Sequence, residues 1–526
     1  MPSRRRQIDK ANISLPRSAA TRLLVYVLAG LGVLVFAISI WNSIGRNLDF
    51  PWTSIRLAPA FALAHGIPLY SMPDKSPWVM VGYGPLYPAA YLPSVLAHHP
   101  RSAVAIATIL AHFYVLAPAG LIFSLLGKRV TGDNARRVHW LCFLLLFALV
   151  THLAPSLAYV TAGVHADAPA VGFFLVACYA MLRAELAAPA YQTRWLLGAG
   201  IAAGLSAACK INFAAVTIGL VIWAWRFFGW KRAALFLSAS FFAVLTIYAM
   251  AAGRDGLSPV LLNLTQPGKM PWFTMSEIEP LTLSGSSHEF SEKLRTFLAF
   301  SRDYLKVYGA IALATILVTF VIGETSKTDR TARLVGFFVF LSLCLSPVSI
   351  ASISKYGGDA NNRALVSLPL SLAAIFALGS LVQRSSRAGL GAMVAALAAA
   401  IFVVALPLKE RIQKVSAGGR PILVEAYSVI RSDPGRWYYP YDPLAHFLVE
   451  RKFRPNMDVI YSYAESGFPV DKDAFRAALP ENLRYLAIPP SVGAWGETEI
   501  RRLLSDYGKP APELSSTRHR VYSAAK

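Results

Sequence analysis

Long apolar runs separated by short polar stretches dominate this sequence. A helix needs about 20 mostly apolar residues to cross a bilayer core of about 30 Å, and many of these runs approach that length. The pattern predicts a mainly α-helical, polytopic membrane protein. We expect about eleven spans, at 22–44, 103–127, 138–158, 168–183, 195–209, 211–228, 233–251, 304–323, 332–348, 364–383 and 388–406.

Two segments need a separate interpretation. Residues 84–97 are apolar but short and contain Pro85, Pro88 and Pro93, which favours a helix lying along the membrane surface or re-entering it. Residues 195–228 would make one helix of roughly 50 Å at 1.5 Å per residue, too long for a single span. We therefore expect two short spans that meet near Lys210.

Beyond Leu408 the apolar density falls and charges of both signs alternate. This change predicts two domains, a transmembrane domain at 1–407 and a small α/β domain at 408–526. In the second we expect helices at 421–430, 443–450, 473–479 and 497–506, and strands at 483–488 and 520–523.

Composition supports the membrane class. Of 526 residues, 55% are hydrophobic and only 15% are charged, with a mean hydropathy of +0.47. Such a chain is not disordered, a coiled coil or an ordinary cytoplasmic enzyme. The net charge of +22 does not indicate nucleic acid, because Lys and Arg fall in short clusters between apolar runs. The four cysteines lie inside apolar runs without metal-ligand spacing, so we interpret them as core residues.

The basic clusters also predict the orientation. The first span follows a basic N-terminal segment, which places the N-terminus in the cytoplasm. With eleven spans, the remaining clusters also fall inside, and the C-terminal domain falls outside. The Ala- and Arg-rich composition favours a bacterial inner membrane. The outer segments are then 45–102, 159–167, 252–303 and 349–363.

Charged and polar side chains stand at the predicted outer ends of the spans. They are Asp49 after the first span, His165 and Asp167 in the second outer loop, Lys210 between two spans, and Lys355, Asp359, Asn361 and Arg363 in the fourth outer loop. Each also has an ordinary structural explanation: an acid favours a helix N-terminus, a lysine extends toward the interface, and Gly357-Gly358 indicates a turn. The topology nevertheless places them all at one membrane face, where they could form one site.

Several motifs resemble the GT-C superfamily of membrane glycosyltransferases, which includes the protein mannosyltransferases and the aminoarabinose and galacturonic acid transferases of lipid A. The acid Asp49 is followed by Gly-Ile-Pro-Leu-Tyr at 66–70 and Tyr-Gly-Pro-Leu-Tyr-Pro at 83–88. His-Ala-Asp-Ala-Pro at 165–169 resembles a second acidic loop, and 355–363 resembles a Lys-x-Gly-Gly-Asp-x-Asn stretch of bacterial relatives. The likeness covers about residues 20 to 380. Its departures are Gly84, where a proline is common, and a single acid at Asp49.

The resemblance implies transfer of a sugar from a polyprenyl phosphate or diphosphate to a lipid, polysaccharide or protein acceptor at the outer face. In agreement, the sequence has no Gly-rich nucleotide loop. Asp49 is then the expected general base, with inversion at the anomeric carbon. Cations would neutralise the departing phosphate, and polar residues would hold the substrate. The expected phosphate-binding residues are Lys210, Lys355 and Arg363, and the expected substrate-binding residues are Tyr70, Tyr83, Asp359 and Asn361.

Three alternatives stay open. No cofactor is required by the resemblance, but Asp49, His165, Asp167 and Asp359 could hold a divalent cation, Mg²⁺ or Mn²⁺. An O-antigen ligase or polymerase is a second alternative, although the loop 252–303 carries few of the Arg and His residues that such enzymes use. A secondary transporter is the third, and the lack of an internal repeat speaks against it.

Overall fold

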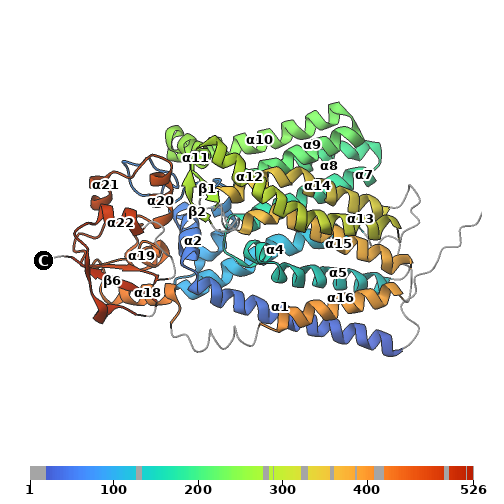
Figure 1. Ribbon diagram of the computed structural model, residues 1–526, viewed down its shortest axis with the longest axis horizontal. Helices are drawn as coiled ribbons and strands as arrows, with labels where there is room; N and C mark the ends of the chain where they lie inside the picture. The colour runs from blue at the N-terminus through green and yellow to red at the C-terminus, as the bar shows by residue number, and fades with distance from the viewer. Residues whose placement is uncertain are drawn as a thin grey trace, which may run out of the picture.

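Most of the chain forms one bundle of long helices with a small α/β part at one end (Figure 1). This computed structural model describes residues 19–125, 133–275, 283–287, 289–321, 330–355, 360–384, 388–407, 420–490, 497–516 and 518–524. We call the end of the bundle that adjoins residues 420–524 the site end, because the candidate residues gather there.

The long helices follow the predicted spans. They are α1 (Ala19–Asp49), α4 (Pro100–Ser124), α5 (Asp133–Leu153), α7 (Asp167–Leu186), α8 (Pro189–Cys209), α9 (Ala214–Phe228), α10 (Trp230–Asp255), α14 (Arg330–Ser354), α15 (Ala364–Arg384) and α16 (Ala388–Ala405). In the described residues, seven helices are long and apolar enough to cross a membrane, or eight if one bent pair counts as a span. The prediction of a polytopic helical membrane protein is therefore confirmed, and the count of about eleven stays a prediction.

The predicted span 138–158 is not one straight helix. Helix α5 ends at Leu153, and α6 (Pro155–Ala162) continues after a bend of 111°. Pro155 lacks the N–H that a continuing helix would need, and it disfavours helical geometry at Ala154, which is extended. The bend turns α6 across the site end of the bundle.

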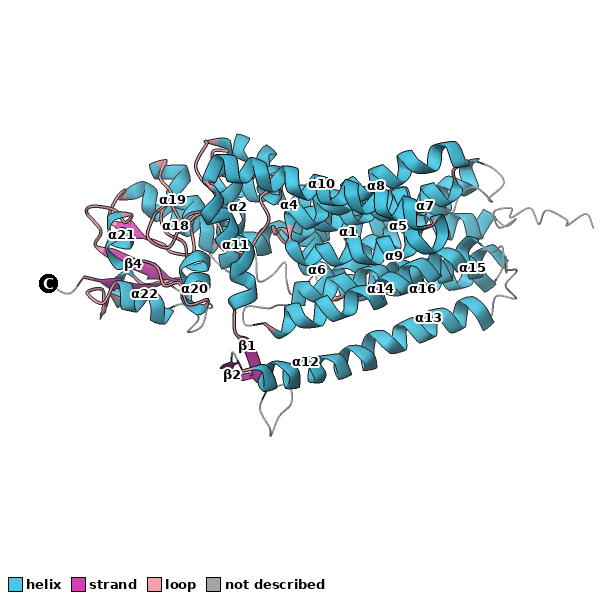
Figure 2. Cartoon of the chain, turned by 90° about the horizontal axis from the view of Figure 1, so that it is seen from above, coloured by secondary structure: helices cyan, strands magenta, loops and turns pink. Residues whose placement is uncertain are grey.

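The predicted outer segment 252–303 contains more structure than its polar sequence indicated. Helix α11 (Leu257–Lys269) is followed by an antiparallel hairpin of β1 (Trp272–Met275) and β2 (Leu283–Ser287). Helix α12 (Phe290–Tyr304), the π turn η4 (Leu305–Gly309) and α13 (Ala310–Val321) then form an almost continuous rod along one edge of the bundle (Figure 2).

The segment 45–102 covers the site end. Helix α2 (Pro51–Ala64) is buried along most of its length and was missed in the sequence. Where one surface helix was expected over 84–97, the structure has two short pieces, α3 (Tyr87–Ala90) and the 3-10 helix η1 (Leu92–Leu96). Between them and α2, the Gly84 and Leu86 N–H groups donate to the carbonyls of Cys209 and Ala208, at 3.0 and 3.2 Å. This loop therefore satisfies carbonyls that the C-terminus of α8 leaves unpaired.

The C-terminal part is an α/β unit, as predicted. Its helices are α18 (Ile422–Ser432), α19 (Pro443–Glu450), α20 (Met457–Glu465), α21 (Lys472–Ala477) and α22 (Glu497–Leu503), with the 3-10 helix η7 (Pro512–Leu514). Its strands β3 (Trp437–Tyr438), β4 (Tyr485–Ile488), β5 (Lys509–Pro510) and β6 (Arg520–Ser523) form one sheet in the order β3-β4-β6-β5. Only the pair β3-β4 is parallel. Helix α20 and strand β3 were not predicted.

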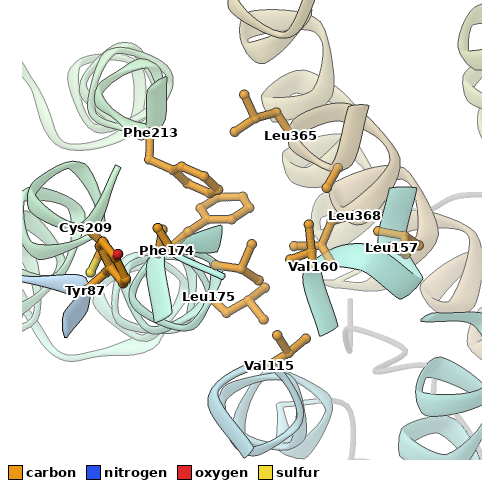
Figure 3. Packing of buried hydrophobic residues seen from close by; sticks show 14 of the residues in the cluster. Tyr87, Val115, Leu157, Val160, Phe174, Leu175, Cys209, Phe213, Leu365 and Leu368 are labelled. Atoms are coloured by element: carbon orange, nitrogen blue, oxygen red, sulfur yellow. The ribbon is translucent and has the colours of Figure 1, made fainter. Parts of the chain in front are cut away.

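An apolar core lies directly under the site end. Figure 3 shows Phe174 of α7 and Phe213 of the 3-10 helix η3 (Ile211–Phe213) packed close together, with Leu365 of α15 beside them. Val160 of α6 belongs to the same cluster of buried residues. Burial of these side chains holds the ends of α6, α7, α9 and α15 together, and so positions the polar residues next to them.

Candidate active site

A buried polar cluster joins three helix ends that are distant in the sequence. Asp167 is the first residue of α7, where the helix dipole favours an acid. Its Oδ1 accepts a hydrogen bond from Lys210 Nζ at 2.8 Å, and its Oδ2 accepts one from Asn361 Nδ2 at 2.7 Å. Lys210 lies between α8 and η3, and Asn361 lies in the 3-10 helix η5 (Ala360–Arg363). The predicted meeting of these outer loops is thus present in the structure.

His165 forms a dyad with Asp167. Its Nδ1 contacts Asp167 Oδ2, and only 3% of the His165 side chain is exposed. Burial lowers the pKa of His165 below its ordinary value, although the Asp167 carboxylate acts in the opposite direction. The imidazole is therefore neutral at pH 7. With its Nδ1–H directed at Asp167, the Nε2 atom is left as a hydrogen-bond acceptor.

Tyr83 connects this dyad to the α/β part. Its hydroxyl lies 3.3 Å from His165 Nε2, and the guanidinium carbon of Arg56 lies 4.5 Å from the centre of its ring. Arg56 in turn forms an ion pair with Asp458 of α20, with Nη1 and Oδ2 2.5 Å apart. Burial would lower the pKa of Arg56, but the Asp458 carboxylate raises it above its usual range, so this arginine stays charged. Neither Arg56 nor Asp458 was singled out in the sequence, because each is an ordinary charged residue within a local amphipathic pattern.

Tyr70 supports Tyr83 from the loop side. Its hydroxyl donates to the Tyr83 carbonyl at 2.7 Å, while its own N–H donates to Asp255 at the end of α10. Burial raises the pKa of both tyrosines, so their hydroxyls stay protonated. Their contacts give Tyr70 a role in holding the loop and place Tyr83 beside His165.

Asp49 lies at the expected end of the first span, and its contacts are with residues that the sequence did not indicate. It ends α1 at the same end of the bundle as Lys210, but its described contacts are with the α/β part. Its Oδ1 accepts from the Ile422 N–H at 3.2 Å, at the first turn of α18, and lies 3.4 Å from the Arg518 guanidinium. Asp49 thus joins α1 to α18, and no described hydrogen bond or ion pair links it to the Asp167 cluster.

The remaining predicted cations have different surroundings. Lys355 Nζ donates to the Pro267 carbonyl of α11 at 2.9 Å, and burial lowers its pKa. Arg363 lies two positions after Asn361 and is exposed. Asp359 lies outside the described residues. Lys210 Nζ is directed at Asp167.

Two cavities flank the short helix α6. The larger, of about 380 Å³, is lined by Ser156 and Leu157 of α6 together with residues of α5, η4, α13 and α15. Its lining is mostly apolar, and Arg363 is the one cation among the lining residues. On this side its lining residues run from Arg363, just before α15, to Ile375 within that helix. The smaller cavity, of about 110 Å³, lies on the other side of α6 and is lined in part by Tyr159 and His165.

The described residues do not form a metal centre. Among them, no group of three or more His, Cys, Asp or Glu side chains could hold a metal ion. Both carboxylate oxygens of Asp167 already accept hydrogen bonds, from Lys210 and Asn361. Asp359, the fourth residue named for a divalent cation, lies outside the described residues, so Mg²⁺ or Mn²⁺ stays an open alternative.

The fold and the cluster together define a polytopic helical membrane protein with a polar site covered by an α/β part. No protein-family description matches the chain, and no curated protein does. Two solved structures of ArnT from Cupriavidus metallidurans are similar. The one bound to undecaprenyl phosphate has a TM-score of 0.44 and 13% identity, over 93% of this chain and 97% of that chain. The apo state has a TM-score of 0.42 and 14% identity, over 96% and 98%.

Proposed function

We propose that this protein is a membrane glycosyltransferase that moves a sugar from a polyprenyl-phosphate donor to an acceptor hydroxyl at the site end of the bundle. One observation carries the proposal. An apolar cavity of about 380 Å³ has a single cation, Arg363, at the end that adjoins the buried His165–Asp167–Lys210 cluster. A charged group at the end of an apolar channel matches a lipid with a phosphate head.

The larger cavity is the donor site in this proposal. The polyprenyl chain lies along α15 between α5 and α13, and the Arg363 guanidinium binds the phosphate, which it can contact with two parallel hydrogen bonds. As the bond between the anomeric carbon and the phosphate oxygen breaks, negative charge grows on the phosphate. Arg363 stabilises this charge, and polyprenyl phosphate is the leaving group.

His165 is the base that the geometry supports best. It lines the smaller cavity, where an acceptor can approach, and its neutral imidazole is oriented by Asp167. The acceptor oxygen forms the new bond to the anomeric carbon as its proton passes to His165 Nε2, and displacement in one step inverts that carbon. Asp167 is a positioning residue. Asp49, the base expected from the sequence, remains the alternative, and its contacts with Ile422 and Arg518 favour a structural role.

Envelope glycans from cells that produce each variant test these roles by mass spectrometry. We expect His165→Gln and Arg363→Ala to remove the product while protein levels stay normal, and Asp49→Asn to retain it. If Asp49→Asn folds normally but loses the product, and His165→Gln retains it, then Asp49 is the general base. A product profile unchanged by all three variants would reject the transferase, and uptake assays in vesicles would then test the transporter.

A further inference from the structure

A polar crevice lies beside α1, outside the two cavities assigned above to donor and base. It has a volume of about 170 Å³, well above the roughly 10–15 Å³ that one water needs. Helices α1, α5 and α16 line it. Four of its lining residues are polar side chains of α1: Ser39, Asn42, Ser43 and Arg46. Ser43 and Arg46 also line the smaller cavity at His165, so the two spaces adjoin.

These polar residues lie toward the site end of α1, at and just after its most apolar stretch. Polar side chains within a membrane span are costly, and Leu23–Asp49, which contains all four, is one of the candidate spans. The two serines are satisfied locally, because their hydroxyls donate to the carbonyls of Val35 and Ser39, each at 2.8 Å. They therefore present the lone pairs of their oxygens to the crevice rather than their protons.

Asn42 is not satisfied. It is only 5% exposed, yet its side-chain oxygen has no hydrogen-bond partner in the described part of the chain. A buried acceptor without a partner is destabilising in water-excluded surroundings. A ligand that donates a hydrogen bond to Asn42 would remove this cost, so the residue itself indicates a ligand with O–H or N–H groups.

The crevice opens toward the lipid-facing side of the bundle. Val403 of α16 lines it and is 48% exposed, and Leu153 at the end of α5 is 37% exposed. Both are apolar, as is most of the exposed surface of α1. An occupant that enters between them can leave its hydrocarbon chains in the membrane and place only its head among the polar residues.

We propose that this crevice binds the polyhydroxylated head of a membrane lipid, and that this lipid is the acceptor. The second half rests on the proposed glycosyltransferase function. Hydroxyls can donate to Asn42 and to the serine oxygens, and can accept from Arg46. An ionised phosphate or carboxylate head could accept from Arg46 and from His152, which also lines the crevice, but it only accepts and so could not donate to the Asn42 oxygen. A hydroxyl of the head group can then reach His165 through the adjoining smaller cavity.

Lipid retention tests the crevice without any turnover. The full-length protein is reconstituted in phosphatidylcholine nanodiscs with equal small amounts of glucosyl-diacylglycerol, diacylglycerol and phosphatidic acid, and retained lipids are measured by native mass spectrometry. We expect the wild type to retain glucosyl-diacylglycerol about tenfold more than the other two, a difference that one or two buried hydrogen bonds provide. Asn42→Leu, and as a second variant Ser43→Leu, should lose this preference. The control is Trp41→Leu, a neighbouring residue that is 73% exposed and does not line the crevice.

The outcomes separate the two proposals. Equal retention of all three lipids, preference for phosphatidic acid, or an unchanged preference in both crevice variants would overturn the crevice assignment. If the preference is lost in Asn42→Leu but no envelope product depends on the protein, the crevice stands and the transferase fails. If transfer occurs and Asn42→Leu leaves the KM for the acceptor unchanged, the transferase stands and the acceptor assignment fails. A rise of about tenfold in that KM, with kcat unchanged, supports both.

Discussion

The carboxylate of Asp167 lies 2.8 Å from the ammonium of Lys210, although 43 positions separate the two residues in the chain. Asp167 begins α7 and Lys210 follows α8, so the pair ties together two adjacent helix ends. Both side chains are at least nine-tenths buried. The pair therefore controls both the stability of the site end and the position of His165.

Removing one member of this pair should be severe. Lys210→Met leaves the Asp167 carboxylate buried without its cation, which typically costs about 3–5 kcal/mol. We expect a clear fall in the thermal unfolding midpoint in detergent, together with loss of the envelope product. The matched control is Arg476→Met, which breaks an ion pair with Asp506 whose side chains are 45% and 50% exposed. Exposed pairs contribute about 0–1 kcal/mol, so an equal effect of both variants would contradict the assigned burial.

Gly84 is required by the close approach of its loop to α8. A Cβ at this position would overlap the carbonyl oxygen of Ala208, and backbone on both sides prevents an easy shift. Gly84→Ala should cost about 1–3 kcal/mol through overpacking and should displace Tyr83 from His165, lowering transfer. Gly198→Ala, in α8 itself, has open space around the new methyl group and should be neutral or slightly stabilising. Thermal unfolding and product yield of the two variants provide the comparison.

The ion pair between Arg56 and Asp458 connects the α/β part to the membrane part. We expect a double-mutant cycle of Arg56→Met and Asp458→Asn to give a coupling of about 0.5–3 kcal/mol, because the two side chains are in direct contact and only 10% and 14% exposed. Limited proteolysis of the intact protein should release fragments from 420–524 faster in either single variant. Additive effects in the cycle would show that the pair does not hold the two parts together.

Glu450 should make the α/β part sensitive to acid. Burial would raise its pKa, but His446, Arg454 and the Gly435 N–H together lower it from 4.5 to about 2. A lowered pKa stabilises the folded state fully above pH 4.5, and this stabilisation is lost as the pH falls toward 2. Scanning fluorimetry between about pH 3 and pH 7 should show a smaller acid-induced fall in the unfolding midpoint for Glu450→Gln than for the wild type. Parallel curves for the two proteins would exclude this role of Glu450.

Much of the helical architecture could be predicted because its signals are local. Apolar runs indicated the long helices, and the excessive length of 195–228 indicated the break at Lys210, which the structure confirms between α8 and α9. In the α/β part, the helix Pro443–Glu450 and the strand Arg520–Ser523 have the predicted bounds. The meeting of Asp167, Lys210 and Asn361 followed from topology, since all three stand at helix ends on one side.

The sequence alone determined the class of the protein, its helices and the set of polar residues at one end of them, because hydrophobicity, proline and chain length act over a few neighbouring positions. Only the tertiary structure decided which of these residues touch. It placed Asp49 against Ile422 rather than in the cluster, paired Arg56 with Asp458 across some 400 positions, and turned α6 so that cavities lie on both of its sides. Those contacts depend on how side chains from distant parts of the chain pack together. A local sequence pattern therefore does not predict which partner each side chain contacts.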